Sequence, residues 1–134
     1  ESMMLIDNVQ RLSQQLRDLR IPFTEDFSSQ LSTTDFIIDS IFGFSFSGEV
    51  REPFPSVIAA LRDSKIPVLA VDAREGNNPD ALISLTAPKP LVKWFEGRHF
   101  VGGRFLTQAM AEKYELDIPP YEGLDQVVEV PANK

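Results

Sequence analysis

The amino-acid sequence predicts an α/β fold built around a largely parallel sheet. A short apolar run, 36–42, is followed by a loop with two glycines and then by a segment with helical periodicity, 53–65. A second run, 66–72, is apolar on both faces, as strands of a parallel sheet are. Because strand, loop and helix follow one another, we expect βα units in a single domain, 1–134.

The N-terminal part of the chain has helical periodicity. Apolar residues recur every three or four positions over 5–19, which predicts an amphipathic helix with one apolar stripe. Two such repeats are too few for a coiled coil. The residues 21–23 fit a short strand, whereas the polar, serine-rich stretch 24–34 gives no clear prediction.

The next stretch joins a strand to a helix. Residues 36–42 are rich in β-branched and aromatic side chains, which predicts a buried strand. Gly43 and Gly48 then enclose alternating aromatic and hydroxyl residues. Pro53 fits the first turn of a helix that ends near Lys65, because apolar residues recur at helical spacing between them.

The two apolar runs 66–72 and 81–86 raise a question of strand direction. Both look buried on two faces, as neighbouring parallel strands do. Parallel strands need a crossover of about a dozen residues or more, whereas only the polar stretch 73–80 lies between these runs. Either the second strand is antiparallel, or a segment is missing after Ala73.

Short elements are predicted for the last third of the chain. Residues 91–95 fit a short helical or irregular turn, and 99–101 fit a brief strand. Thr107 is suited to cap a final helix, because its hydroxyl oxygen accepts a bond from a free N–H of the first turn. Residues 127–130 fit an edge strand.

Composition and charge argue against several function classes. A net charge of −7 argues against a nucleic-acid or anionic-membrane surface as the main partner. No apolar run approaches the ~18 residues that a membrane span needs. No targeting leader is visible, so we expect a cytoplasmic or mitochondrial protein.

The side-chain inventory restricts the chemistry further. The absence of cysteine removes disulfides, thiolate nucleophiles and cysteine-zinc sites. His99 is the single histidine, and no G-x-S-x-G motif is present, so we expect His99 to begin a strand without a catalytic task. Carboxylates, lysines, hydroxyls and backbone amides remain for catalysis or binding.

Two carboxylates and one loop are candidate site residues. Asp39 interrupts an apolar run and therefore needs a cation or several donors. Asp72 ends a strand, at the edge where open parallel sheets bind ligands, although an acid there is about as often plain turn chemistry. The loop from Gly43 to Gly48 could bring N–H groups close to a ligand, but glycines in such turns more often serve geometry, and no nucleotide fingerprint is present.

Several longer stretches form a familiar pattern. They are DSIFGFSFSGEVREP (39–53), VD (71–72), LISLTAPK (82–89), GGRF (102–105) and KYELDIPPY (113–121). In this order they resemble the NAD(P)H-hydrate epimerase family, the YjeF N-terminal domain. The resemblance implies a Rossmann-like three-layer αβα sandwich with a mostly parallel sheet, and a homodimer. It also implies an epimerase that interconverts the R and S forms of hydrated NADH and NADPH, so that a partner dehydratase can restore the cofactor.

The resemblance also implies roles for individual residues. Asp39 would help to bind a potassium ion. The substrate would be lined by one continuous loop, namely Gly43, Phe44, Ser45, Phe46, Ser47, Gly48 and Glu49. Asp72 would contact the substrate too, and we infer that it is the carboxylate best placed for proton transfer.

The chain departs from the family pattern at two places. The family's phosphate-side glycine loop is absent, and so is a loop expected after Ala73 that carries a hydroxyl ligand for potassium. We therefore expect part of a longer protein, incomplete at its N-terminal side. Two alternatives to the epimerase stay open: a non-catalytic ligand-binding or dimerisation scaffold of the same fold, and a generic nucleotide-binding domain of flavodoxin type, which rests on fold analogy only.

Overall fold

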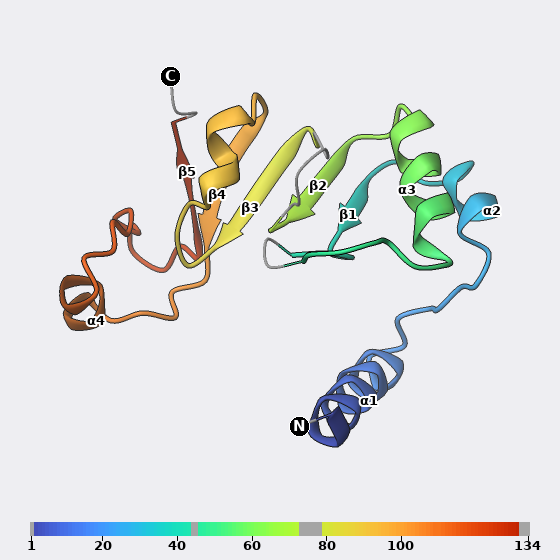
Figure 1. Ribbon diagram of the computed structural model, residues 1–134, viewed down its shortest axis with the longest axis horizontal. Helices are drawn as coiled ribbons and strands as arrows, with labels where there is room; N and C mark the ends of the chain where they lie inside the picture. Colours follow the sequence, from blue (N-terminus) through green and yellow to red (C-terminus); the bar gives the residue numbers. More distant parts are fainter. Residues whose placement is uncertain (1, 44–45, 73–78, 132–134) are drawn as a thin grey trace. The chain divides into compact units, whose positions relative to one another are not determined.

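The computed structural model describes residues 2–43, 46–72 and 79–131 (Figure 1). The chain forms two compact units, Glu1–Ser32 and Thr33–Lys134. Within the described residues, no helix combines the length and the apolar character that a membrane crossing requires.

The first unit contains the predicted N-terminal helix, α1 (Ser2–Asp18). Its apolar stripe includes Val9, Leu12 and Leu16, and these side chains are exposed. The prediction of a helix over 5–19 is therefore confirmed to within one residue at its C-terminal end.

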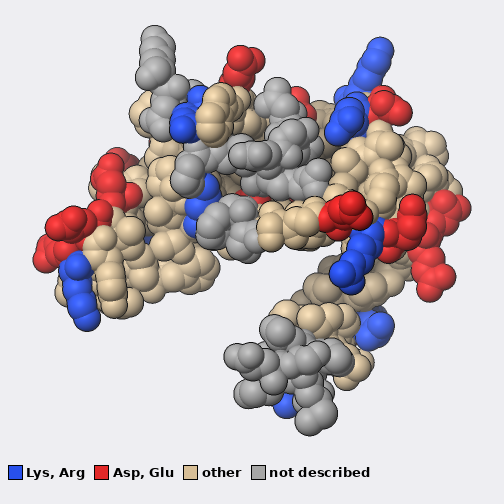
Figure 2. All heavy atoms as spheres, viewed as in Figure 1, with Lys and Arg blue, Asp and Glu red and all other residues tan. Residues whose placement is uncertain are grey.

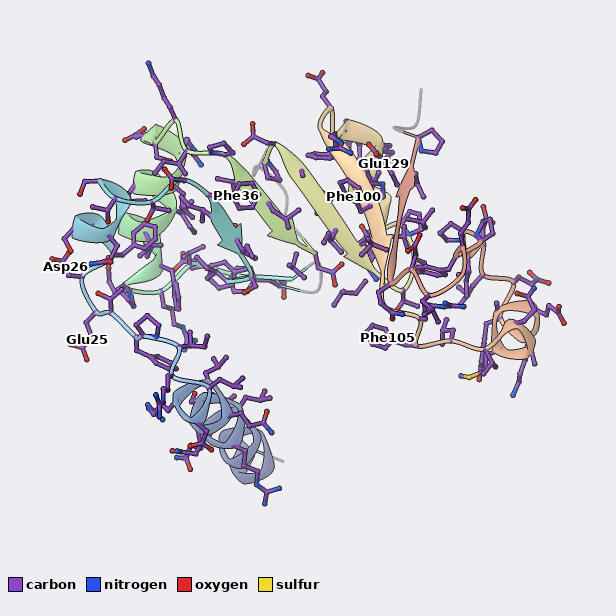
Figure 3. The ribbon with its side chains drawn as sticks, turned by 180° about the vertical axis from the view of Figure 1, so that it is seen from behind. Glu25, Asp26, Phe36, Phe100, Phe105 and Glu129 are labelled. Atoms are coloured by element: carbon purple, nitrogen blue, oxygen red, sulfur yellow. The ribbon has the colours of Figure 1, made fainter. Side chains whose placement is uncertain are left out.

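A second, shorter helix in this unit was not predicted. This helix, α2 (Phe27–Leu31), begins after Asp26, whose Oδ1 accepts a hydrogen bond from the N–H of Ser29 at 3.1 Å. Figure 3 labels Asp26 at this position. The short strand predicted over 21–23 is wrong: these residues have no strand structure, and the Phe23 ring instead lies 5.0 Å from the guanidinium of Arg17.

The second unit is built on a five-stranded sheet in which spatial order equals chain order. The first four strands are parallel and the fifth is antiparallel to the fourth, so the predicted mostly parallel sheet and its edge strand are confirmed. The strands are β1 (Ile37–Asp39), β2 (Val68–Val71), β3 (Ala81–Leu85), β4 (Arg98–Gly102) and β5 (Val127–Val130).

The relative direction of strands β2 and β3 decides between the two alternatives left by the sequence. They pair in parallel, with Val71 opposite Ile83, so the antiparallel alternative is wrong. The connection between them, 72–80, is shorter than the usual parallel crossover of about a dozen residues.

Helices flank the sheet along the chain, as an α/β fold requires. The first is α3 (Phe54–Asp63), in which Pro53 is the N-cap residue and not, as predicted, part of the first turn. A 3₁₀ turn, η1 (Pro90–Trp94), precedes β4. The last helix, α4 (Gln108–Lys113), is capped by the hydroxyl of Thr107, as predicted.

The core lies between the middle of the sheet and η1. Buried apolar side chains from β2, β3 and the segment around η1 form one cluster: Ala70, Leu82, Val92 and Phe95. Beside it, His99 of β4 is 2% exposed, and its Nε2 lies 2.9 Å from the Oγ of Ser84 on β3. Burial lowers the pKa of His99.

The first strand of the sheet is not buried, contrary to the prediction. Phe36 is 52% exposed and Ile38 is 65% exposed. The reason is position, because β1 is the edge of the sheet within the described part of the chain. Phe36 is labelled beside this strand in Figure 3.

At the opposite edge of the sheet, an ion pair joins strands β4 and β5. Arg98 of β4 donates two hydrogen bonds to the carboxylate of Glu129 on β5, at 3.0 and 2.8 Å. These bonds lower the pKa of Glu129 and raise that of Arg98. Figure 3 shows Glu129 beside Phe100, its register partner on β4.

Candidate active site

Asp72 is held at the carboxyl end of the sheet by two backbone contacts to β3. Its N–H donates to the carbonyl oxygen of Ile83 at 2.9 Å, and its Oδ1 accepts from the N–H of Leu85 at 2.9 Å. The backbone of Asp72 has φ 51°, a left-handed conformation that aspartate tolerates better than most residues. The carboxylate therefore lies at the edge where parallel sheets bind ligands.

The segment that binds the Asp72 carboxylate continues into a strained turn. Ala87 donates its N–H to the carbonyl oxygen of Leu85 at 2.9 Å, and the residue between them, Thr86, has φ 73°. These two features define a tight turn of a rare and strained kind, and a β-branched residue at its centre adds to the strain. A further contact fixes the turn to the sheet, because Thr86 N–H donates to the Gly102 carbonyl oxygen at 2.9 Å.

Lys89 supports the same turn, a role that the sequence did not suggest. Its Nζ donates to the carbonyl oxygen of Leu85 at 2.9 Å. The backbone of Leu85 is thus held by the Asp72 carboxylate at its N–H and by the Lys89 ammonium at its carbonyl. The signal was present in the sequence, since Lys89 ends the LTAPK stretch, but only the structure shows which atom it binds.

The glycine loop approaches Asp72 through Gly43. A Cβ atom added to Gly43 would lie 3.9 Å from the Cβ of Asp72, so these two predicted site residues are neighbours. The loop begins to turn here, because Phe46 N–H donates to the Gly43 carbonyl oxygen at 3.1 Å. Two other predicted substrate-lining residues, Phe44 and Ser45, lie outside the described residues.

The remaining loop residues divide into a packed and an exposed group. The Phe46 ring stacks on Phe42 with 4.0 Å between centroids, and Phe42 also meets Phe54 of α3 edge-on at 5.4 Å. Ser47, Gly48 and Glu49 are exposed. The aromatic contacts anchor one side of the loop to α3.

Asp39, the predicted metal ligand, ends β1 and is half-buried. Its Oδ1 accepts a hydrogen bond from the N–H of Ile41 at 3.0 Å. Among the described residues, no group of three or more histidine, cysteine, aspartate and glutamate side chains is suited to hold a metal ion. Hard cations are bound by several oxygen ligands, so the described acidic side chains do not make a complete potassium site.

Comparison with known proteins gives the family. The family model described as YjeF-related protein N-terminus matches residues 4–91. The chain belongs to this family. All the predicted site residues lie inside that match, which supports the resemblance drawn from the sequence.

The YjeF-related chain is similar to curated proteins named NAD(P)H-hydrate epimerase. One from Phaeosphaeria nodorum is 64% identical over 138 residues, covering 92% of this chain and 58% of that protein. One from Neurospora crassa is 54% identical, covering 96% of this chain and 61% of that protein. The chain therefore spans about three fifths of the length of these curated relatives.

A solved structure of the same family shares the fold. The crystal structure of the yeast protein YNL200c superposes with a TM-score of 0.79 at 32% identity, covering 90% of this chain and 59% of that one. The Rossmann-like α/β fold predicted from the sequence is therefore confirmed.

The relatives carry more residues within the matched region. The match to the Phaeosphaeria nodorum protein runs over 138 positions but covers 92% of this chain, about 123 residues, so about 15 positions face gaps in this chain. The Neurospora crassa protein gives nearly the same difference, since 143 positions cover 96% of this chain, about 129 residues. About 14 to 15 aligned positions of each relative thus have no counterpart in this chain.

Proposed function

We propose that the whole protein to which this chain belongs interconverts the R and S epimers of hydrated NADH and NADPH. The family match and the names of the relatives support this activity. The structural observation that carries the proposal is the adjacency of Gly43 and Asp72, which brings the glycine loop and a fixed carboxylate to one place at the carboxyl edge of the sheet.

Asp72 is assigned the proton transfer. Inversion at C6 of the hydrated nicotinamide ring requires protons to move at or near the carbon that bears the hydroxyl. Oδ1 of Asp72 is occupied by the N–H of Leu85, and no described residue binds Oδ2, which leaves this oxygen to face the ring. A carboxylate held in one orientation is a suitable general acid–base.

The glycine loop is assigned the binding of the substrate ring. Because Gly43 has no side chain, it places no side-chain atom beside the Asp72 side chain, where a flat ligand group would bind. The exposed residues Ser47 and Glu49 offer polar groups farther along the loop. The stack of Phe46 on Phe42 would keep that loop in position during binding.

In this proposal, potassium is a bound ion that takes no part in the chemical step. Asp39 would supply one oxygen ligand at the end of β1, and oxygen atoms other than acidic side chains, such as backbone carbonyls or hydroxyls, would complete the set. The ion would contribute positive charge near the loop. The proton transfer assigned to Asp72 does not depend on it.

A homodimer is part of the proposal and is tested separately. The resemblance to the family is its support. Light scattering of the whole protein should give twice the mass of one chain at micromolar concentration. A monomer at that concentration would contradict the dimer without affecting the assignment of Asp72.

The activity itself is tested with the whole protein and a single epimer. Purified S or R hydrate is supplied, and conversion to the other form is followed by chiral or reverse-phase separation. We expect conversion well above the spontaneous rate. Binding of the hydrate without conversion would show that the protein is a scaffold and would overturn the proposal.

A further inference from the structure

A hollow opens beside the strained turn at Thr86. It has a volume of about 480 Å³, within the range of small-molecule sites. We call it the Arg104 hollow; its walls include Thr86, Gly103, Arg104, Leu106, Pro119 and Tyr121. It lies beyond the family match, which ends at residue 91, except for its wall at Thr86.

Arg104 is held in a fixed position at the mouth of this hollow. Its Nη1 donates to the carbonyl oxygen of Gly123 at 2.9 Å, and its guanidinium lies 5.4 Å from the centre of the Tyr121 ring. The side chain is nevertheless exposed. Because a guanidinium has five N–H donors, one bond to Gly123 leaves donors for a ligand.

The charge of Arg104 is not balanced by a carboxylate within the described ranges. There the ion pair that forms is Arg98 with Glu129, at the start of β4, whereas Arg104 follows the end of that strand. Acidic side chains nevertheless abound nearby, as Figure 2 shows over α4 and the segment that follows it. Although the net charge of −7 disfavours anions in general, an arginine without an ion-pair partner among the described residues can bind one through charge-assisted hydrogen bonds.

Two residues in the walls of the hollow have backbone conformations with positive φ. Gly103 has φ 80°, and a Cβ atom there would collide with the ring of Phe105, which Figure 3 labels at this end of β4. Thr86, another wall residue, has φ 73° and donates its N–H to the carbonyl oxygen of Gly102 on β4. Strain of this kind is retained where surrounding contacts over-determine it, and it concentrates at ligand sites.

The other walls combine several apolar residues with the amide side chain of Gln108. Leu106, Ile118 and the pair Pro119 and Pro120 face the hollow together with Arg104. Apolar walls with one fixed cation are suited to a ring that carries an anionic group. Arginine in particular matches phosphate, because its donors form a planar fork.

We propose that the Arg104 hollow binds the phosphate monoester of a small aromatic or heterocyclic compound, with the phosphate on Arg104 and the ring against the proline wall. This site is separate from the Gly43–Asp72 site, and the proposal does not depend on epimerase activity. The two sites share one structural element, because Leu85 binds Asp72 and the next residue, Thr86, lines the hollow.

The test is a calorimetric titration of the full-length protein with phenyl phosphate. We expect saturable binding at roughly millimolar affinity or tighter. Arg104→Met should weaken it at least about tenfold, the usual value of a charge-assisted hydrogen bond, and Arg104→Lys should fall between the two because the fork is lost. Phenol and inorganic phosphate should each bind more weakly than phenyl phosphate.

Three further variants keep the result interpretable. Arg62→Met removes a cation from α3 and should leave the titration unchanged. Leu106→Trp fills the hollow while leaving the bond from Arg104 to Gly123 intact, and it should abolish binding even if Arg104→Met fails to fold. Asp72→Asn should have no effect on phenyl phosphate. Unchanged binding in a folded Arg104→Met or Leu106→Trp protein, or loss of binding in Asp72→Asn, would overturn the proposal.

Discussion

The N–H of Leu85 binds Oδ1 of Asp72 at 2.9 Å, so a backbone group of β3 fixes the orientation of an acid that follows β2. The contact uses Oδ1, and the proposal assigns the other carboxylate oxygen to the substrate. It also ties the position of the acid to the turn that Lys89 supports from the other side. Substitutions at these positions therefore test chemistry and architecture separately.

Asp72→Asn should preserve the fold and slow epimerisation by ~10²-fold or more, the usual value of positioned acid–base catalysis. The amide oxygen of asparagine can still accept the bond from Leu85, and asparagine tolerates φ 51°. Turnover of a single epimer by the full-length protein is the measurement. Near-normal turnover in this variant would remove the proton-transfer role.

Asp72→Ala is the companion variant, because it removes the accepting oxygen and places alanine at a left-handed position. We expect a lower melting temperature, from the lost bond and from backbone strain of about 1–2 kcal/mol. Thermal unfolding of the two variants separates the structural from the chemical role. Equal melting temperatures would show that the bond to Leu85 contributes no stability.

Gly43→Ala should weaken substrate binding without unfolding the protein. The added methyl group would lie 3.9 Å from the Asp72 side chain, an ordinary contact, but it occupies space beside the acid. Gly48→Ala is the contrast, since Gly48 has φ 103° and no atom within 4 Å of an added Cβ. The Gly48→Ala variant should be less stable because of backbone strain. Its substrate affinity should not change, because it adds no atom beside Asp72. The measurements are substrate affinity and melting temperature, and the idea fails if both variants change the same quantity.

Stability should fall as the pH drops through the titration of His99. Burial depresses the pKa of the folded-state imidazole below its ordinary value of 6.5. The unfolded chain therefore binds more protons, and the free energy of unfolding decreases from about pH 6.5 down to the depressed folded-state value. Above pH 6.5 this contribution is constant.

The measurement is urea unfolding of wild type and His99→Gln at several pH values. Glutamine can still bond to Ser84 but does not titrate, so the difference between the two curves isolates the histidine from nearby acids. A difference that stays constant from pH 7 to pH 5 would contradict the assignment.

Asp39→Ala should abolish any potassium dependence of substrate binding or rate. The half-buried carboxylate lies at the end of β1, and in the proposal its loss removes a charge that would attract the cation. Rates are compared in potassium and in choline chloride at equal ionic strength. A normal potassium response in the folded variant would show that Asp39 is not a ligand.

Much of the fold followed from the sequence because hydrophobic periodicity reports local structure. The stretch 66–72 and the helix 53–65 were predicted nearly to their ends, and Thr107 was identified as a cap. The prediction of a buried first strand was wrong because burial depends on what lies beside a strand. The sequence of 36–42 contains no information about neighbours.

The candidate site was predicted in part. Asp72 and Gly43 were identified separately, by a strand end and by a loop glycine, but their contact depends on the order of β1 and β2 in the sheet. The support from Lys89 was not predicted, since a lysine after a proline normally indicates a surface turn. The sequence also gave no sign that Thr86 takes a strained conformation, because a threonine after a strand is compatible with many turns.

The agreement between spatial and chain order in the sheet has a consequence for synthesis on the ribosome. Each strand pairs with the one made just before it, so none has to be inserted between two partners that are already joined. Such pairing keeps the sequence separation between paired strands smaller than an order in which distant strands pair. The sheet can therefore grow from β1 toward β5 as the chain emerges, and Arg98 and Glu129 close it when the last strand arrives.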